Sequence, residues 1–168
     1  MNLITTTNTY SCLVAAFAMA CEVSFDTFIK LLGHDGSAFP YSNPYYRAGF
    51  HPQEFIEVIL KLGWLATPIE QNPVLTPDGI DLRDIYFNSS EAGNLARFLQ
   101  HLTNTTTGVI EGILQRKAGG IVGHAVAWDG THIYDPRGYV YSFSECETMK
   151  YTPRILWKLM RIGVDNEV

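Results

Sequence analysis

Residues 123–136 have the sequence GHAVAWDGTHIYDP, in which two runs of β-forming residues flank Asp129 and Gly130. An Asp-Gly pair between such runs predicts a β-hairpin, because a type I′ turn needs positive φ at both central residues. If these two residues form the whole loop, His124 lies directly opposite Asp135 on the neighbouring strand. Side chains of a cross-strand pair share one face of the sheet, with Cβ atoms about 4.5–5.5 Å apart. The pattern therefore predicts that an imidazole and a carboxylate meet on this hairpin.

The predicted pair of His124 and Asp135 has a chemical interpretation and a structural one. A carboxylate that holds one imidazole nitrogen fixes the tautomer and leaves the other nitrogen free to act as a base. The same hydrogen bond also occurs as a purely structural contact between strands. A three-residue loop would change the register and separate the two side chains. His132 lies on the opposite face of the predicted hairpin and would replace His124 only after such a slip.

A base of this kind needs a nucleophile, and one of the three cysteines lies where a helix is predicted to begin. Residues 10–21 are rich in alanine, leucine and methionine, which favour a helix, and they are apolar on nearly every side. We therefore expect a central, buried helix. Suitable N-caps for it are Asn8, Thr9 and Ser11. Each of these caps would leave Cys12 in the first turn.

The start of a helix is a favourable place for a reactive thiol. Its free N–H groups and its dipole stabilise a thiolate, and the same N–H groups can stabilise an oxyanion beside the sulfur. Cys21 lies nine residues further on, about half a revolution around the helix, and is expected to be a core residue. Cys146 lies between two glutamates, whose charges would raise its thiol pKa. Cys12 is therefore the candidate nucleophile.

The remaining pattern predicts helices in the first part of the chain and strands in the last. Further helices are expected over residues 24–32, 52–62 and 89–102. Strands besides the hairpin are expected over residues 64–69, 108–114, 139–143 and 154–160. The first of these strands contains Pro68, which is typical of an edge strand. This order predicts an α+β fold with segregated helices and strands, in a single domain spanning residues 1–168.

Residues 33–51, between the second and third predicted helices, are rich in glycine, proline and tyrosine. Such a loop either lines a substrate cleft or lies on the surface, held down by its aromatic side chains. Under the first interpretation, Tyr41, Tyr45 and Tyr46 contact the substrate. Trp128 on the hairpin is a further candidate for substrate contact.

Composition and charge exclude several classes of function. The chain carries 17 acidic and 12 basic residues, a formal charge of −5, which argues against nucleic acid or an anionic membrane as a main partner. The N-terminal residues lack the features of a signal peptide, and the longest apolar run, nine residues from Leu13 to Cys21, is too short to span a bilayer. The odd number of cysteines indicates a reducing, cytoplasmic compartment. The histidines show no metal-ligand spacing, so neither a metal nor another cofactor is expected.

Two stretches of the chain resemble the papain-like cysteine peptidases. Residues 8–16, NTYSCLVAA, are similar to the cysteine-bearing helix start of that family. Residues 123–130, followed by Asp135 and Pro136, are similar to its histidine strand and the strand that carries its third residue. The most similar branch is that of the double-glycine peptidases, which process bacteriocin leaders. The resemblance covers both ends of the chain, whereas residues 33–107 do not align.

The resemblance implies a two-layer papain-like fold, with a helical half that carries the cysteine and an antiparallel sheet that carries the histidine and the aspartate. It implies Cys12 as nucleophile, His124 as general base and acid, and Asp135 as the orienting residue. One position departs from the family, which usually has a glutamine six residues before the cysteine as oxyanion donor. That position is Thr6 here, and Asn8 is our candidate donor together with the Cys12 N–H group. Loss of one such donor lowers rates by about 10²–10³-fold.

Three functions fit this pattern. The first is a cysteine hydrolase, a peptidase acting on a peptide or protein substrate through an acyl-enzyme. The second is an acyltransferase, deamidase or transglutaminase-like enzyme with the same triad, because the second acceptor alone separates these reactions. The third is a binding module that keeps the fold without activity. The sequence leaves the substrate, the cleavage preference and the oligomeric state open.

Overall fold

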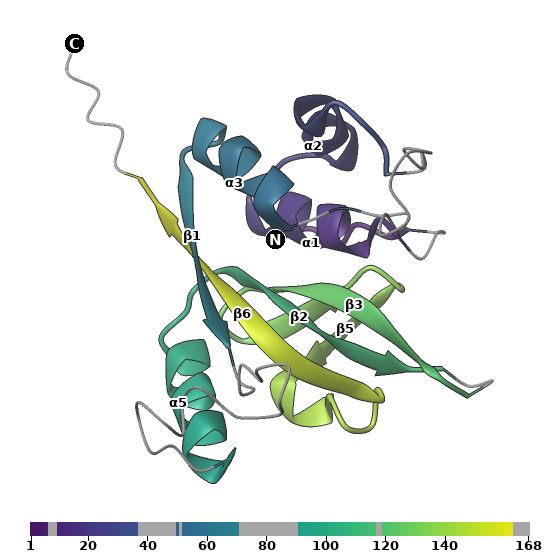
Figure 1. Ribbon diagram of the computed structural model, residues 1–168, viewed down its shortest axis with the longest axis vertical. Helices are drawn as coiled ribbons and strands as arrows, with labels where there is room; N and C mark the ends of the chain where they lie inside the picture. Colours follow the sequence, from purple (N-terminus) through teal and green to yellow (C-terminus); the bar gives the residue numbers. More distant parts are fainter. Residues whose placement is uncertain (7–9, 37–49, 51, 71–90, 117–118, 163–168) are drawn as a thin grey trace, which may run out of the picture.

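The computed structural model describes residues 1–6, 10–36, 50, 52–70, 91–116 and 119–162 (Figure 1). Its helices are α1 (Cys12–Ala20), α2 (Phe25–Leu32), α3 (Pro52–Lys61) and α5 (Glu91–Thr103), with a short 3₁₀ helix, η1 (Phe143–Glu145). Its strands are β1 (Trp64–Glu70), β2 (Gly108–Gln115), β3 (Ile121–Trp128), β4 (His132–Asp135), β5 (Tyr139–Ser142) and β6 (Tyr151–Arg161). The predicted α+β class is confirmed.

The six strands form one antiparallel sheet in the order β1-β6-β2-β3-β4-β5. The last strand, β6, lies between β1 and β2, so the final strand of the described chain is an interior strand of the sheet. Strand β1, which contains Pro68, lies at one edge as its proline predicts, because proline cannot donate a hydrogen bond to a second neighbour. Strands β3 and β4, which carry His124 and Asp135, lie toward the other edge.

Helices cover both faces of the sheet (Figure 1). Helices α1, α2 and α3 gather on one face, where α1 packs mainly against β3 and β2. Strand β3 contributes side chains to the hydrophobic cores on both faces of the sheet, because successive side chains of a strand point to opposite faces. Ala125 and Ala127 pack with α1, whereas Val126 and Trp128 pack with α5 on the other face. Each of these two hydrophobic clusters also contains one buried cysteine, Cys21 in the α1 cluster and Cys146 in the α5 cluster.

Helix α1 is the buried central helix that the sequence predicts. Every residue from Leu13 to Ala20 is buried, which fits a segment that is apolar on nearly every side. Of the three predicted caps, Ser11 occupies the N-cap position, although its side chain makes no capping hydrogen bond. Cys12 is therefore the first residue of the helix. No helix in the described part of the chain is, by itself, long and apolar enough to cross a membrane.

Candidate active site

The predicted hairpin is present, but its register is shifted by two residues. Trp128 pairs with Ile133 instead of Thr131, so the prediction that His124 lies directly opposite Asp135 is wrong. Because side chains alternate between the two faces of a strand, a shift by an even number returns each residue to the expected face. The side chains of His124 and Asp135 therefore still point to the same face of the sheet. They are diagonal neighbours across the two strands instead of a directly opposed pair.

The turn explains the shifted register. The carboxylate of Asp129 accepts hydrogen bonds from the backbone N–H groups of Thr131 and His132, at 2.9 and 2.7 Å. Asp129 therefore precedes the turn, and Gly130 and Thr131 are its central residues. Gly130 has a φ of +97°, whereas Thr131 is not in the left-handed region. Positive φ at the first central residue alone is typical of a type II′ turn, not of the type I′ turn that was predicted.

His124 and Asp135 form a buried hydrogen bond. The distance from His124 Nε2 to Asp135 Oδ1 is 2.8 Å, and the two residues are 9% and 0% exposed. Because Asp135 engages Nε2, the nitrogen that remains for other partners is Nδ1. The ring of Tyr151 packs edge-on against the imidazole, with the ring centroids 5.9 Å apart.

Asp135 is held by three side chains and one backbone amide. Besides His124, the backbone N–H of Arg137 donates to Oδ1 at 2.9 Å. The Arg137 guanidinium donates to Oδ2 from Nε at 2.9 Å and from Nη2 at 2.6 Å, and the Tyr141 hydroxyl donates to the same oxygen at 3.2 Å. Burial by itself would raise the pKa of Asp135, but the hydrogen bonds from His124 and Arg137 and their charges hold it well below its usual range. Asp135 is therefore an anion at neutral pH.

Cys12 lies beside the imidazole, at the start of α1, and its side chain is half-buried. Burial by itself would lower the pKa of His124. The hydrogen bonds to Asp135 and to Cys12, together with the charge of Asp135, outweigh burial and raise this pKa to about 9. The structure thus brings together the thiol, the imidazole and the carboxylate that the sequence singled out. This geometry favours an imidazolium at neutral pH, stabilised from both sides.

The other two cysteines are unsuited to nucleophilic chemistry. Burial raises the pKa of Cys21 to about 12, and burial together with the charges of Asp135 and Glu145 raises the pKa of Cys146 to about 12. The sequence predicted a core position for Cys21 and a raised pKa for Cys146, although for Cys146 burial contributes more than the neighbouring glutamate does.

A pocket of about 140 Å³ adjoins Cys12 and His124. Its other lining residues are Thr6 from the N-terminal segment, Leu114 and Arg116 from β2 and its end, Val122 and Gly123 from β3, and Arg137 after β4. Thr6, where the resemblance predicts a glutamine, thus lines the same pocket as the candidate nucleophile. Its backbone N–H donates to the Pro136 carbonyl at 2.9 Å, which ties the N-terminal segment to the end of β4.

Several predicted site residues are not brought to this pocket. Trp128 is 5% exposed and lies in the α5 core, where its indole N–H donates to the Thr105 carbonyl at 2.9 Å. This burial argues against the predicted substrate contact, because almost none of the Trp128 side chain is exposed. The predicted oxyanion donor and the predicted aromatic substrate contacts lie outside the described residues: Asn8, Tyr41, Tyr45 and Tyr46.

Sequence reasoning missed the residues that surround the candidate triad. Arg137 and Tyr141 fix Asp135, and Arg116 lines the pocket. The only local signal was the position of Arg137, two residues after the aspartate in a predicted turn. Tyr141 reaches the carboxylate because β5 pairs with β4, and no short-range pattern reports that pairing.

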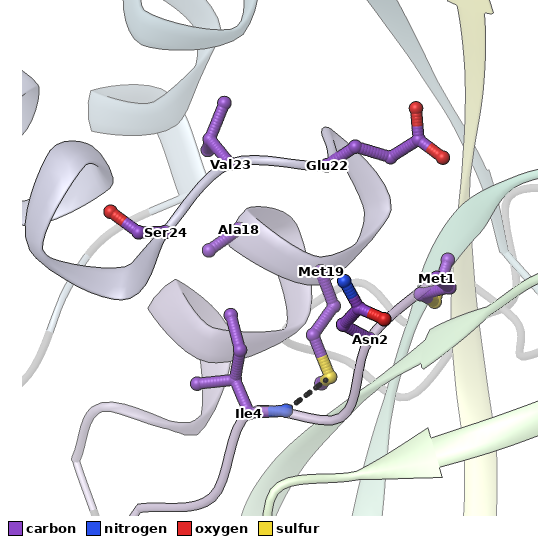
Figure 2. Close-up of a pocket in the computed structure, with 8 residues that line it drawn as sticks. All are labelled: Met1, Asn2, Ile4, Ala18, Met19, Glu22, Val23 and Ser24. Atoms are coloured by element: carbon purple, nitrogen blue, oxygen red, sulfur yellow. Dashed lines mark hydrogen bonds between the residues drawn. The ribbon is translucent and has the colours of Figure 1, made fainter.

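A larger pocket, of about 320 Å³, lies at the opposite end of α1 (Figure 2). Residues 1–4 cross beside the end of the helix there, and the backbone N–H of Ile4 contacts the Met19 sulfur at 3.1 Å. Glu22 is the only charged side chain among the residues that line this pocket, and it is exposed. The candidate nucleophile, base and carboxylate all lie elsewhere, so the larger of these two pockets is not the candidate site.

The chemistry available at the candidate site is that of a thiol and its base. Within the described residues, no group of three histidine, cysteine, aspartate or glutamate side chains is placed to hold a metal ion.

No family model matches this chain, and comparisons with curated proteins and with solved structures gave no significant match. The function therefore has to be argued from the geometry of the site.

Proposed function

We propose that this protein is a cysteine hydrolase with a papain-like fold, which cleaves an amide bond in a peptide or protein substrate. One observation carries the proposal: His124 lies between a buried carboxylate and a cysteine at the start of a helix. The carboxylate bonds Nε2 at 2.8 Å, and the raised pKa of the imidazole reflects hydrogen bonds to both neighbours. A thiol so placed is activated as a thiolate paired with an imidazolium.

The proposed reaction has two halves. The Cys12 thiolate attacks the amide carbonyl carbon, and the N–H group of Cys12 at the helix start donates to the oxyanion that forms. The C–N bond then breaks as His124 gives its proton to the leaving amine. Water attacks the resulting thioester, gives a proton to His124 and releases the acid, which restores the thiolate and the imidazolium.

Asp135 supports this cycle without exchanging a proton. It is an anion held by Arg137 and Tyr141, so it keeps the N–H of the imidazole on Nε2. Nδ1 is then the nitrogen that alternately carries and releases the proton toward Cys12. The same contact stabilises the positive charge of the imidazolium, as the orienting carboxylate does in other nucleophile–histidine pairs.

The rate of iodoacetamide labelling of Cys12, measured against pH, tests the proposal. We expect labelling to persist below pH 7 in the wild type and to collapse there in His124→Ala, because the thiolate then loses its partner. His132→Gln is the matched control, since this exposed histidine, whose side chain hydrogen-bonds the Thr131 hydroxyl, is not among the residues that line the pocket and should leave the profile unchanged. A single titration near the ordinary thiol pKa of about 8.5, unaffected by His124→Ala, would overturn the proposal.

A further inference from the structure

The pocket beside Cys12 is cationic although the protein as a whole is acidic. Two of its lining residues are arginines, Arg116 and Arg137, and none of the described residues that line it carries a carboxylate. The chain has a formal charge of −5, so the overall field repels anions and this pocket is a local exception. The exception lies where a substrate group next to the scissile carbonyl would be bound.

The two arginines differ in the hydrogen-bond and ion-pair partners that their guanidinium groups already have. The guanidinium of Arg137 is engaged by Asp135 through Nε and Nη2, and it also lies 5.5 Å from the centroid of the Tyr139 ring. Arg116 is exposed, and its guanidinium has no hydrogen-bond or ion-pair partner among the described residues. The charge of Arg116 is therefore the one available to a ligand.

The backbone of Arg116 is held by two hydrogen bonds. Its N–H donates to the Gly120 carbonyl at 3.0 Å, and its carbonyl accepts from the Gly119 N–H at 3.0 Å. These bonds fix the side chain's point of attachment at the rim of the pocket. Leu114 and Val122, also in the lining, provide an apolar wall beside it.

We propose that this pocket selects substrates that carry a carboxylate close to the bond attacked by Cys12, and that Arg116 is the residue that binds it. The guanidinium fork matches a carboxylate through two parallel hydrogen bonds, and the apolar wall suits the methylene groups that would lead to it. An acidic side chain and a free C-terminal carboxylate both provide this chemistry. The inference rests on the proposed function and adds the substrate class to it.

Two alkylating reagents of nearly equal shape test the inference. Iodoacetate and iodoacetamide both place a methylene carbon on the Cys12 sulfur and release iodide, but only iodoacetate carries a carboxylate. We expect Arg116→Gln to lower the ratio of the iodoacetate rate to the iodoacetamide rate by about 2- to 5-fold, the size of an exposed ion pair. The iodoacetamide rate is the internal reference, so a general effect of the substitution on thiol reactivity cancels in the ratio. Rates are measured by mass spectrometry of the peptide that contains Cys12.

A matched variant separates local from overall charge. Arg97→Gln removes the same charge from an exposed position on α5, outside the residues that line the pocket, and should leave the ratio unchanged. An equal fall in both variants, or no fall in Arg116→Gln, overturns the inference. Loss of the His124-dependent iodoacetamide labelling would instead overturn the proposed function, so the two failures are distinguishable.

Protection of Cys12 from iodoacetamide then identifies the source of the carboxylate. The probes are three tripeptides: one blocked at both ends with a central glutamate, the same peptide with glutamine, and an all-alanine peptide with a free C-terminus. Protection by the glutamate peptide alone identifies an acidic side chain, and protection by the free C-terminus alone identifies that group. Equal protection by the glutamine peptide overturns carboxylate selection.

Discussion

Arg137 holds both oxygens of Asp135: its backbone N–H donates to Oδ1, and its guanidinium donates twice to Oδ2. Asp135 is fully buried, whereas the side chain of Arg137 is 30% exposed. The arginine thus connects a buried anion to the surface. Arg137, two residues after Asp135 in the turn that follows β4, thus fixes the carboxylate on which the orientation of His124 depends.

Removing this arginine should destabilise the fold. We expect Arg137→Met to lower the free energy of unfolding by about 1–3 kcal/mol, because the buried carboxylate loses charged donors while its remaining partners stay. Urea unfolding at pH 7 measures the loss. Glu22→Gln is the control, since it removes an exposed ion pair with Arg161, at 3.5 Å, and should cost less than about 1 kcal/mol. Equal losses in the two variants would show that the Asp135 contact contributes little.

Stability should also fall as the solution becomes alkaline. The folded state raises the pKa of His124 from 6.5 to about 9, so the folded protein binds this proton more tightly than the unfolded chain does. The stabilisation is complete below about pH 6.5 and is lost as the pH rises through 9, up to about 3 kcal/mol in total. Urea unfolding at pH 7 and pH 10 measures it in the wild type and in His124→Gln. An equal loss in both proteins would contradict the assignment of the change to His124.

The pKa of Asp135 has the opposite effect on the acid side. Its folded value is depressed, so its contribution is present above about pH 3.8 and is lost as the pH falls below that value. Asp135→Asn should therefore unfold with a weaker acid dependence than the wild type, as followed by circular dichroism between pH 5 and pH 2. A variant that loses stability in acid as steeply as the wild type would assign the acid transition to other carboxyl groups.

The turn after β3 gives a sharp test of the register. In the predicted type I′ turn, residue 129 would need positive φ, so glycine there would be neutral or better than aspartate. In the structure, Oδ1 of Asp129 instead accepts from two backbone N–H groups and from the Thr131 hydroxyl. We therefore expect Asp129→Gly to cost about 1 kcal/mol in urea unfolding, and Asp129→Asn, which keeps an acceptor, to cost less. A neutral Asp129→Gly would favour the type I′ turn.

The second oxyanion donor can be assigned by two substitutions. Our sequence candidate is Asn8, whereas Thr6 lines the pocket next to Cys12. We expect Asn8→Ala to lower kcat on a cleaved peptide by about 10²–10³-fold with no change in the iodoacetamide rate, because alkylation forms no oxyanion. Thr6→Val should change kcat by no more than a few-fold. The reverse ranking would assign the donor to the Thr6 hydroxyl.

The parts of the fold that short-range patterns control were predictable. The apolar run after Ser11 predicted the buried helix α1, and the Asp-Gly pair predicted a hairpin. The exact turn was not predictable from that pair, because Asp129 suits either a central position or a capping position. The end of β5 at Ser142 did have a local signal. Ser142 and Glu145 form a capping box that opens η1, where the prediction continued the strand.

Features that depend on distant partners were not predictable. Strand β6 begins at Tyr151, three residues before the predicted start, because pairing with β2 extends it. The register shifts between Glu111 and Gly112, whose partners are Ile155 and Pro153, so the extra residue of the bulge is Arg154 on β6. The candidate triad was found because two of its members lie on one hairpin and the third begins a helix. Tyr141 and Arg116 were missed because strand pairing brings them to the site, and Arg137 was missed because its position two residues after Asp135 is not a specific signal.

The two inert cysteines give this protein built-in reporters of local unfolding. Cys21 is buried in the core under α1, and Cys146 is buried in the core under α5, on the other face of the sheet. Both thiols are buried, and burial raises their pKa values to about 12, so we expect each to react rapidly only after its own layer opens. The order in which the two become modifiable in rising urea therefore records which side of the sheet loosens first. One native chain can thus distinguish loss of the helical layer from loss of the α5 layer without an introduced probe.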